Sequence, residues 1–172
     1  METWDLYTRE RVLTGKTHIR GEEIPEACYH LVVHVWIRNA NGEYLISQRA
    51  ANRASLPLMW ECVGGSVLAG ESSLEGALRE VKEEVGISLD PQLGTPAFSR
   101  VRDQVNGQRF ADILDVWVFC YDGPVALESA TTDEVAQCQW MPPQQIRALA
   151  DSGKLVPTLH YFFTEILNTA ER

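Results

Sequence analysis

Three glutamates, Glu80, Glu83 and Glu84, stand at positions i, i+3 and i+4 within the segment ALREVKEEVGI. In a helix this spacing places their carboxylates on one face, where each pair of like charges is destabilising by about 0.2–0.5 kcal/mol. Arg79 lies four residues before Glu83 and can neutralise one of them, which leaves a surplus of negative charge. A hard divalent cation such as Mg²⁺ would stabilise the cluster, because it is held by a few carboxylates together with substrate phosphates. The alternative is a solvated acidic face.

Local signals predict the helix that carries these carboxylates. Ser72 with Glu75 three residues later forms a capping box, and Gly86 is typical of a helix C-terminus, so the predicted helix spans about 73–85. Gly76 falls one turn before Glu80, where it leaves room for a ligand or for close packing, or is simply tolerated. The side chains that gather on the core-facing side are Leu74, Ala77, Leu78, Val81 and Val85.

Runs of β-branched and aromatic residues predict two hairpins. Residues 29–49 contain Asn41-Gly42, a dipeptide that readily adopts the positive φ angles of a tight turn. Residues 95–121 turn at 105–108, and the apolar run that follows predicts a strand buried on both faces. The remaining predicted elements are an edge strand at Trp4–Tyr7, a strand over 135–140, and helices over about 143–151 and 157–169.

This alternation of strands and helices predicts an α/β fold, an α/β/α sandwich around a mixed sheet. The chain has 172 residues and no obvious linker, so we expect a single domain over 1–172 in which 1–28 forms an N-terminal extension or edge strand.

Composition excludes several functional classes. The formal net charge of −9 argues against nucleic acid as a partner, because phosphate backbones are bound by clustered Lys and Arg. The four cysteines are widely separated, which excludes a zinc ribbon or a disulfide framework and favours reduced thiols. No signal peptide or membrane-spanning run of about 18 apolar residues is present, so we expect a cytoplasmic protein with no membrane partner.

The region from Gly65 to Ile87 resembles the Nudix box, G-x5-E-x7-R-E-U-x-E-E-x-G-U, where U is an aliphatic residue. Gly65, Glu71 and the run from Arg79 to Ile87 match every defined position. On this resemblance the chain is identified as a member of the Nudix hydrolase superfamily, with its loop-helix-loop box at 64–87.

The resemblance implies roles for these residues. Glu80, Glu83 and Glu84 would bind Mg²⁺, or Mn²⁺ as a substitute, and the carbonyl of Gly65 is a further candidate ligand. Arg79 would orient a carboxylate, and Glu71 would support the helix. In the implied reaction a water attacks a phosphorus atom of a small-molecule diphosphate, and the catalytic proton acceptor is Glu83, Glu84 or Glu134.

Substrate recognition must come from other residues. Arginine presents a bidentate fork to phosphate, and among the arginines we expect Arg49, Arg20 and Arg100 to bind substrate. Arg49 is favoured because it ends a strand close to the loop that leads into the box. The wider set of basic candidates is Lys16, Arg20, Arg49, Arg53, Arg100 and Arg102.

The stretch from about residue 4 to residue 65 resembles the isopentenyl-diphosphate-isomerase-like branch of the superfamily. Isomerases of that branch carry a catalytic cysteine, but Cys62 lies two residues before the matching position, and His30 and His34 are more typical of packed strand histidines. Hydrolysis of a nucleoside-, sugar- or isoprenoid-linked diphosphate is therefore the main hypothesis. An isomerase-like enzyme and a non-catalytic ligand-binding Nudix module are the alternatives, and either a monomer or a homodimer fits the sequence.

Overall fold

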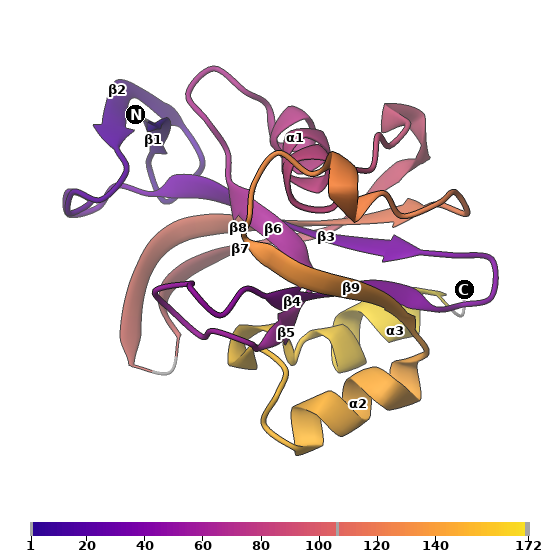
Figure 1. Cartoon of the computed structure of the whole chain (residues 1–172). Coiled ribbons are helices and arrows are strands. Elements are labelled where there is room, and N and C mark those ends of the chain that lie inside the picture. Colours follow the sequence, from indigo (N-terminus) through magenta and orange to yellow (C-terminus); the bar gives the residue numbers. More distant parts are fainter. Residues whose placement is uncertain (1, 106, 171–172) are drawn as a thin grey trace.

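A mixed central sheet lies between the helix α1 on one side and α2 and α3 on the other (Figure 1). The computed structural model describes residues 2–105 and 107–170. The strands are β1 Thr3–Tyr7, β2 Leu13–Ile19, β3 His30–Arg38, β4 Tyr44–Arg49, β5 Trp60–Glu61, β6 Val63–Ser66, β7 Gly94–Val105, β8 Gln108–Cys120 and β9 Val135–Met141. The α-helices are α1 Ser73–Val85, α2 Pro143–Asp151 and α3 Leu167–Ala170, and short 3-10 turns occupy Pro91–Leu93, Leu127–Ser129 and Pro157–Leu159.

The strand β3 is the centre of the main sheet. It pairs in parallel with β8 along its whole length, antiparallel with β6, and with β4 at the Arg38–Tyr44 pair. The order along the sheet is β5-β4-β3-β8-β7, with β9 on β4. Both predicted hairpins, β3–β4 and β7–β8, are confirmed, although Asn106 of the second turn lies outside the described residues.

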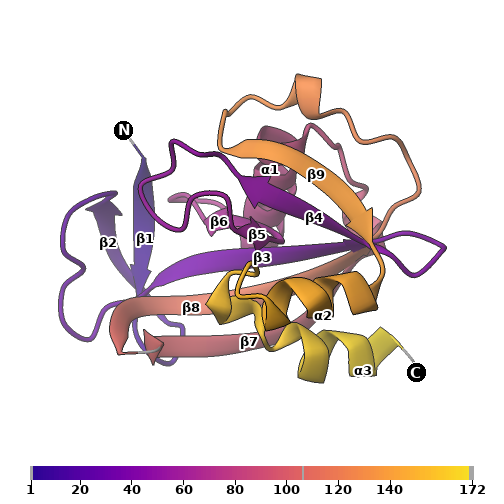
Figure 2. The same ribbon diagram turned by 60° about the horizontal axis from the view of Figure 1, so that its bottom comes forward.

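Alternation along β3 explains the two cores. Leu31, Val33 and Val35 point to the face covered by α1, whereas Val32 and Trp36 point to the opposite face. Figure 2 shows α2 and α3 lying across that second face. The run from Ala111 to Val116 in β8 is buried throughout, as a strand covered on both faces should be.

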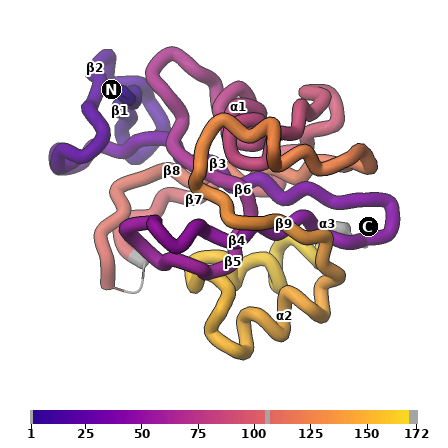
Figure 3. Tube along the Cα trace, viewed as in Figure 1, coloured from indigo at the N-terminus to yellow at the C-terminus, as the bar shows by residue number. Residues whose placement is uncertain are grey.

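The N-terminal strand differs from the expected edge strand. β1 pairs with β2 in a separate two-stranded sheet, and it contacts the main sheet through the Tyr7–Tyr29 backbone bridge and the stacking of Trp4 on His30. Figure 3 shows this sheet beside the loop that enters α1. Two ion pairs, Arg9–Asp103 and Arg11–Asp115, hold the β1–β2 connection against the main sheet. These partners are about 100 residues away in sequence, so local patterns could not reveal them.

The C-terminal segment also differs from the single helix expected over 157–169. A 3-10 turn is followed by a π-helical turn at Phe162–Ile166, and only α3 is α-helical. The wide turn accompanies the burial of two successive aromatic rings: Phe162 stacks on Trp36, and the Tyr161 hydroxyl receives a hydrogen bond from the indole of Trp36. Among the helices described, none is both long enough and apolar enough to cross a membrane.

Candidate active site

The helix α1 begins and ends where the sequence predicted. The Ser72 side chain accepts a hydrogen bond from the Glu75 amide at 3.3 Å, and the Glu75 carboxylate accepts one from the Ser72 amide at 2.8 Å. Gly86 closes the helix with φ of 72°, and its amide bonds the carbonyl of Lys82. The two caps fix which residues of the helix face the sheet and which face its open end.

A single guanidinium organises three acidic side chains. Arg79 donates to Glu71 from Nε at 2.8 Å, and from Nη1 to Glu80 at 2.9 Å and to Glu83 at 3.0 Å. Its Nη2 also bonds the carbonyl of Ser66 at 2.9 Å. Partial burial alone would lower the pKa of Arg79, but the bond to Glu71 and the charge of Glu80 outweigh it and raise that pKa. Arg79 therefore remains charged and fixes the loop and the helix together.

Two consecutive glycines in β6 allow the helix to approach the sheet. A Cβ atom at Gly65 would lie 2.3 Å from Oε1 of Glu80, and one at Gly64 would lie 2.5 Å from the carbonyl oxygen of Val33. Both distances are shorter than any normal contact, so the Glu80 carboxylate lies directly against bare backbone. Gly76 is likewise packed, since a Cβ there would lie 2.9 Å from the Val67 side chain. Close packing, rather than room for a ligand, explains this glycine.

Glu84 is the most unusual carboxylate in the structure. It is only 6% exposed, and burial followed by the charges of Glu80, Glu61 and Glu134 raises its pKa well above the ordinary value. Arg53 acts in the opposite direction but pairs with Glu134 at 2.5 Å. Within residues 2–105 and 107–170, no Lys or Arg forms an ion pair with Glu84. A buried carboxylate without a cationic partner is expensive to hold in its charged form.

These carboxylates open onto a cavity of about 130 Å³. Its wall contains five glutamates and two arginines, so negative charge is in excess. The lining residues are Glu2, Arg20, Arg53, Gly64, Gly65, Ser66, Glu80, Glu83, Glu84, Thr132 and Glu134.

The structure brings together most of the residues chosen from sequence. Gly65, the three helix glutamates, Glu134 and Arg20 line this cavity, and Arg79 and Glu71 lie directly behind it. Arg49 and Arg100 are not part of its wall: Arg49 pairs with Glu61 at 2.7 Å and Arg100 pairs with Glu165. Neither guanidinium is therefore placed to meet a phosphate in this cavity.

Five lining residues were not selected from sequence as site residues: Glu2, Arg53, Gly64, Ser66 and Thr132. Arg53 was among the basic candidates, but no local pattern favoured it over Arg49. The amide of Thr132 bonds the carbonyl of Glu83 at 3.3 Å, which holds the loop before β9 at the end of α1. Glu2 reaches the cavity because Thr3 pairs with Ile19 in the separate N-terminal sheet.

The oxygen donors of this cavity fit a hard divalent cation, although they are not yet arranged as a complete ligand set. In the part of the chain that the structure describes, no three acidic, histidine or cysteine side chains already surround one point as metal ligands. Glu80 and Glu83 bind Arg79 instead. The residues that would hold Mg²⁺ are Glu80, Glu83 and Glu84, because a cation there would relieve the uncompensated charge of Glu84.

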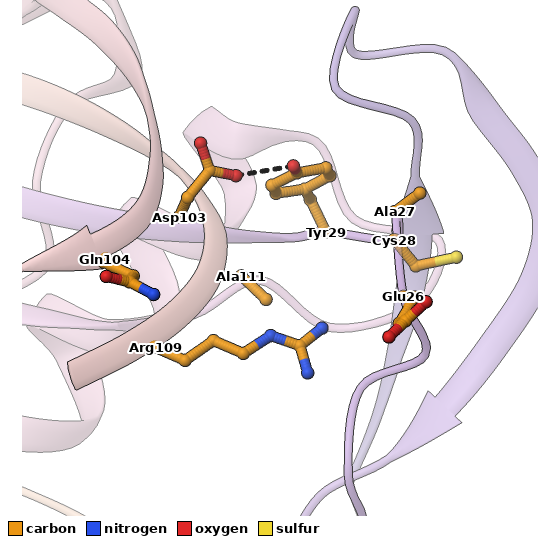
Figure 4. Close-up of a pocket in the computed structure, with 8 residues that line it drawn as sticks. All are labelled: Glu26, Ala27, Cys28, Tyr29, Asp103, Gln104, Arg109 and Ala111. Carbon is orange, nitrogen blue, oxygen red and sulfur yellow. Dashed lines mark hydrogen bonds between the residues drawn. The ribbon is translucent and has the colours of Figure 1, made fainter. Parts of the chain in front are cut away.

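A larger cavity of about 500 Å³ lies elsewhere, at the start of β3 (Figure 4). Its Asp103 already accepts a hydrogen bond from the Tyr29 hydroxyl at 2.6 Å and pairs with Arg9. Its Arg109 donates to the carbonyl of Ile24 at 3.2 Å. These groups satisfy one another, so size alone does not make this cavity the catalytic one.

The strand histidines and Cys62 behave as packed residues. His30 stacks on Trp4 with ring centroids 4.2 Å apart, and burial, aided by Arg102, lowers its pKa to about 4. His34 Nδ1 lies 2.7 Å from the Tyr161 hydroxyl, and burial lowers its pKa to about 3. Burial raises the pKa of the Cys62 thiol well above its usual range. Both rings are therefore neutral near pH 7, and Cys62 is protonated.

Comparison with known proteins places this geometry in a family. The NUDIX domain family model matches residues 29–160. An uncharacterized Nudix hydrolase, lin0387, of Listeria innocua is 38% identical over 164 residues, covering 95% of this chain and 91% of its own length. Among solved structures, DR0079 of Deinococcus radiodurans has a TM-score of 0.70 at 21% identity, covering 90% of this chain and 92% of its own. A MutT protein of Methanosarcina mazei has a TM-score of 0.66 at 25% identity, covering 84% and 96%.

Proposed function

This chain belongs to the Nudix hydrolase family, and we propose that it is a Mg²⁺-dependent enzyme that cleaves the diphosphate linkage of a small-molecule substrate. The observation that carries this proposal is the buried Glu84, which shares the wall of a cavity with four other glutamates and forms no ion pair with a Lys or Arg of the described residues. A fold under selection for stability alone would gain by neutralising such a group.

The residues in and behind the cavity wall have distinct roles in the proposed reaction. Glu80, Glu83 and Glu84 hold Mg²⁺, which when bound supplies neutralisation of developing charge and activation of water. Arg79 positions Glu80 and Glu83, and Gly65 leaves the space that the Glu80 carboxylate needs.

The two arginines of the cavity bind the diphosphate. Arg20 and Arg53 are each held by one glutamate, Arg20 by Glu2 at 2.7 Å and Arg53 by Glu134 at 2.5 Å. A phosphate is a stronger bidentate partner than water for the remaining guanidinium hydrogens.

We assign proton acceptance from the attacking water to Glu134. It lines the cavity from the loop before β9, whereas the other two candidates, Glu83 and Glu84, belong to α1 and to the proposed metal site. Its ion pair with Arg53 at 2.5 Å orients the carboxylate.

The alternative reactions are less well supported. Isomerisation of isopentenyl diphosphate would need a reactive cysteine, but Cys62 is buried, holds its proton, and is not among the residues lining the cavity. A purely ligand-binding module would not need the full set of helix carboxylates. Deuterium uptake into isopentenyl diphosphate without phosphate release is the result that would instead favour the isomerase.

The test is release of phosphate or pyrophosphate, with Mg²⁺ and then with EDTA, across a substrate panel. The panel contains isopentenyl and geranyl diphosphates, nucleoside di- and triphosphates, ADP-ribose, NADH and coenzyme A. We expect turnover of at least one compound that EDTA abolishes. Absence of phosphate or pyrophosphate release from every compound of the panel, or turnover that EDTA does not change, would contradict the proposal.

A further inference from the structure

A second cavity, of about 460 Å³, adjoins the wall of the catalytic one. Its volume is within the usual range of about 300–1,000 Å³ for small-molecule sites. The residues that line it are Arg49, Ser55, Leu56, Glu61, Gln108, Phe110, Val156, Pro157 and Thr158. They come from the end of β4 and the loop after it, from β5, from the start of β8, and from the 3-10 turn at Pro157–Leu159 with the residue before it.

Two adjacent ion pairs separate the cavities. Arg53–Glu134 borders the catalytic cavity, and Arg49–Glu61 borders the second one. They are neighbours, because the Ala50 amide bonds the carbonyl of Glu134 at 2.8 Å and the charges of Arg53 and Glu134 both affect the pKa of Glu61. The two cavities therefore lie on opposite sides of one wall formed by these ion pairs.

The second cavity offers no cation to a phosphate. The guanidinium of Arg49 bonds Glu61 through Nη1 and the carbonyl of Ser55 through Nε and Nη2, at 2.7, 3.1 and 2.9 Å. These contacts engage all three guanidinium nitrogens and fix the loop from 50 to 59, so Arg49 acts as a positioning residue for that loop.

The loop fixed by Arg49 presents apolar surface at the cavity. Leu56 is 44% exposed and Leu58 is 54% exposed. Both have positive φ angles, 48° and 62°, which are unfavourable for residues with a Cβ atom. Leu56 faces the cavity together with Phe110, Val156 and Pro157. Apart from the mutually paired Arg49 and Glu61, the polar lining residues, Ser55, Gln108 and Thr158, are uncharged.

We propose that this cavity binds the group X attached to the diphosphate, and that X is uncharged and predominantly apolar. The inference rests on the proposed function for the orientation of the substrate. It excludes compounds whose X carries further phosphates, because no free cation in the cavity would replace their hydration. Buried apolar surface, rather than hydrogen bonding, would then distinguish one substrate from another.

The experiment compares methyl, butyl and hexyl diphosphates with uridine 5′-diphosphate in the Mg²⁺-loaded enzyme. We expect kcat/KM to rise by at least about 100-fold from methyl to hexyl, because hexyl adds five methylenes and even one methylene in an apolar pocket changes kcat/KM by about 10-fold or more. In Leu56→Asp we expect at least about a 10-fold loss on hexyl diphosphate and less than about 2-fold on methyl diphosphate. The matched control is Leu93→Asp, a leucine of comparable exposure (53% against 44% for Leu56) that lines neither cavity.

Titration calorimetry of hexyl and methyl monophosphates, with Mg²⁺ present, measures X binding without turnover. Turnover that is independent of chain length, or a uridine compound cleaved as fast as the hexyl one, would overturn the inference and leave the proposed function standing. No turnover, but hexyl binding that Leu56→Asp abolishes, would overturn the proposed function and support the apolar cavity. Absence of both turnover and chain-length-dependent binding would overturn both.

Discussion

Glu84 and Asp112 are both buried carboxylates of the same domain, with exposed fractions of 6% and 3%, but their surroundings are opposite. Asp112 accepts two hydrogen bonds from Arg102, both at 2.7 Å, in a bidentate pair. Glu84 has carboxylates for neighbours, and the arginine that offsets them is bound to another glutamate.

This difference distinguishes a carboxylate that stabilises the fold from one that we propose takes part in the reaction. Burial raises the pKa of both groups, but at Asp112 the guanidinium of Arg102 opposes the shift, whereas at Glu84 further negative charge adds to it. A buried carboxylate that pairs with its own arginine needs no ligand to compensate its negative charge. A buried carboxylate that is surrounded by other carboxylates at a cavity wall would need a bound cation for that compensation.

The largest effect that tests the comparison of Glu84 with Asp112 is expected from Glu84→Gln. We expect kcat with Mg²⁺ to fall by about 10³-fold or more, because removing a group that acts on transition-state charge has effects of this size. The metal-free protein should become more stable at pH 7, with Tm higher by several degrees, since about 1 kcal/mol corresponds to about 2–4 °C in a chain of this length. Steady-state kinetics and calorimetry measure the two effects. Full activity in this variant would show that Glu84 is not part of the metal site.

Asp112→Asn should give the opposite result. It leaves the Arg102 guanidinium buried without its carboxylate, so we expect the free energy of unfolding to fall by about 3–5 kcal/mol. Urea denaturation measures this loss. The control is Asp103→Asn at the exposed Arg9 pair, which should lose no more than about 1 kcal/mol. Equal losses of unfolding free energy in both variants would show that the buried Arg102–Asp112 pair stabilises the fold no more than the exposed Arg9–Asp103 pair does.

Gly65→Ala tests the space beside Glu80. The added methyl would lie 2.3 Å from Oε1 of Glu80, so the carboxylate must move, and we expect kcat to fall by about 10–100-fold with the fold retained. Gly123→Ala is the matched control, because its methyl meets only the movable ring end of Tyr121. Unchanged kcat in Gly65→Ala would show that the position of the Glu80 carboxylate is not critical.

The smallest expected effect concerns His30, whose pKa is lowered to about 4 by burial and then by Arg102. Because this folded-state pKa lies below the ordinary 6.5, the unfolded chain binds more protons between pH 6.5 and 4. The free energy of unfolding should therefore fall as the pH decreases through that window. In His30→Gln the fall should be smaller by about 1–2 kcal/mol. Denaturation curves at pH 7, 5.5 and 4.5 measure the difference, and parallel curves for the two proteins would contradict it.

The sequence predicted what is local. The bounds of α1 followed from Ser72, Glu75 and Gly86, all within the helix and its caps, and the turn at Asn41-Gly42 needed only a dipeptide. Spacing alone also placed Glu80, Glu83 and Glu84 on one face of this helix.

What the sequence could not predict depends on distant partners. From sequence, Arg49 and Arg100 were expected to bind phosphate, but in the fold they form ion pairs with Glu61 and Glu165. Glu2 and Arg53 reach the cavity through pairings of β1 with β2 and of β4 with β9. The choice among surface arginines is therefore decided by tertiary structure, not by residue type.

The parallel pairing of β3 with β8 has a consequence for how the chain reaches this fold. It joins residues about 80 positions apart, so a large loop must close before β3 and β8 can exchange hydrogen bonds. The β7–β8 hairpin needs no such closure. We expect the hairpin to form early and the docking of β3 to limit the folding rate, so that truncations within β3, such as Val33→Ala, slow folding more than they speed unfolding.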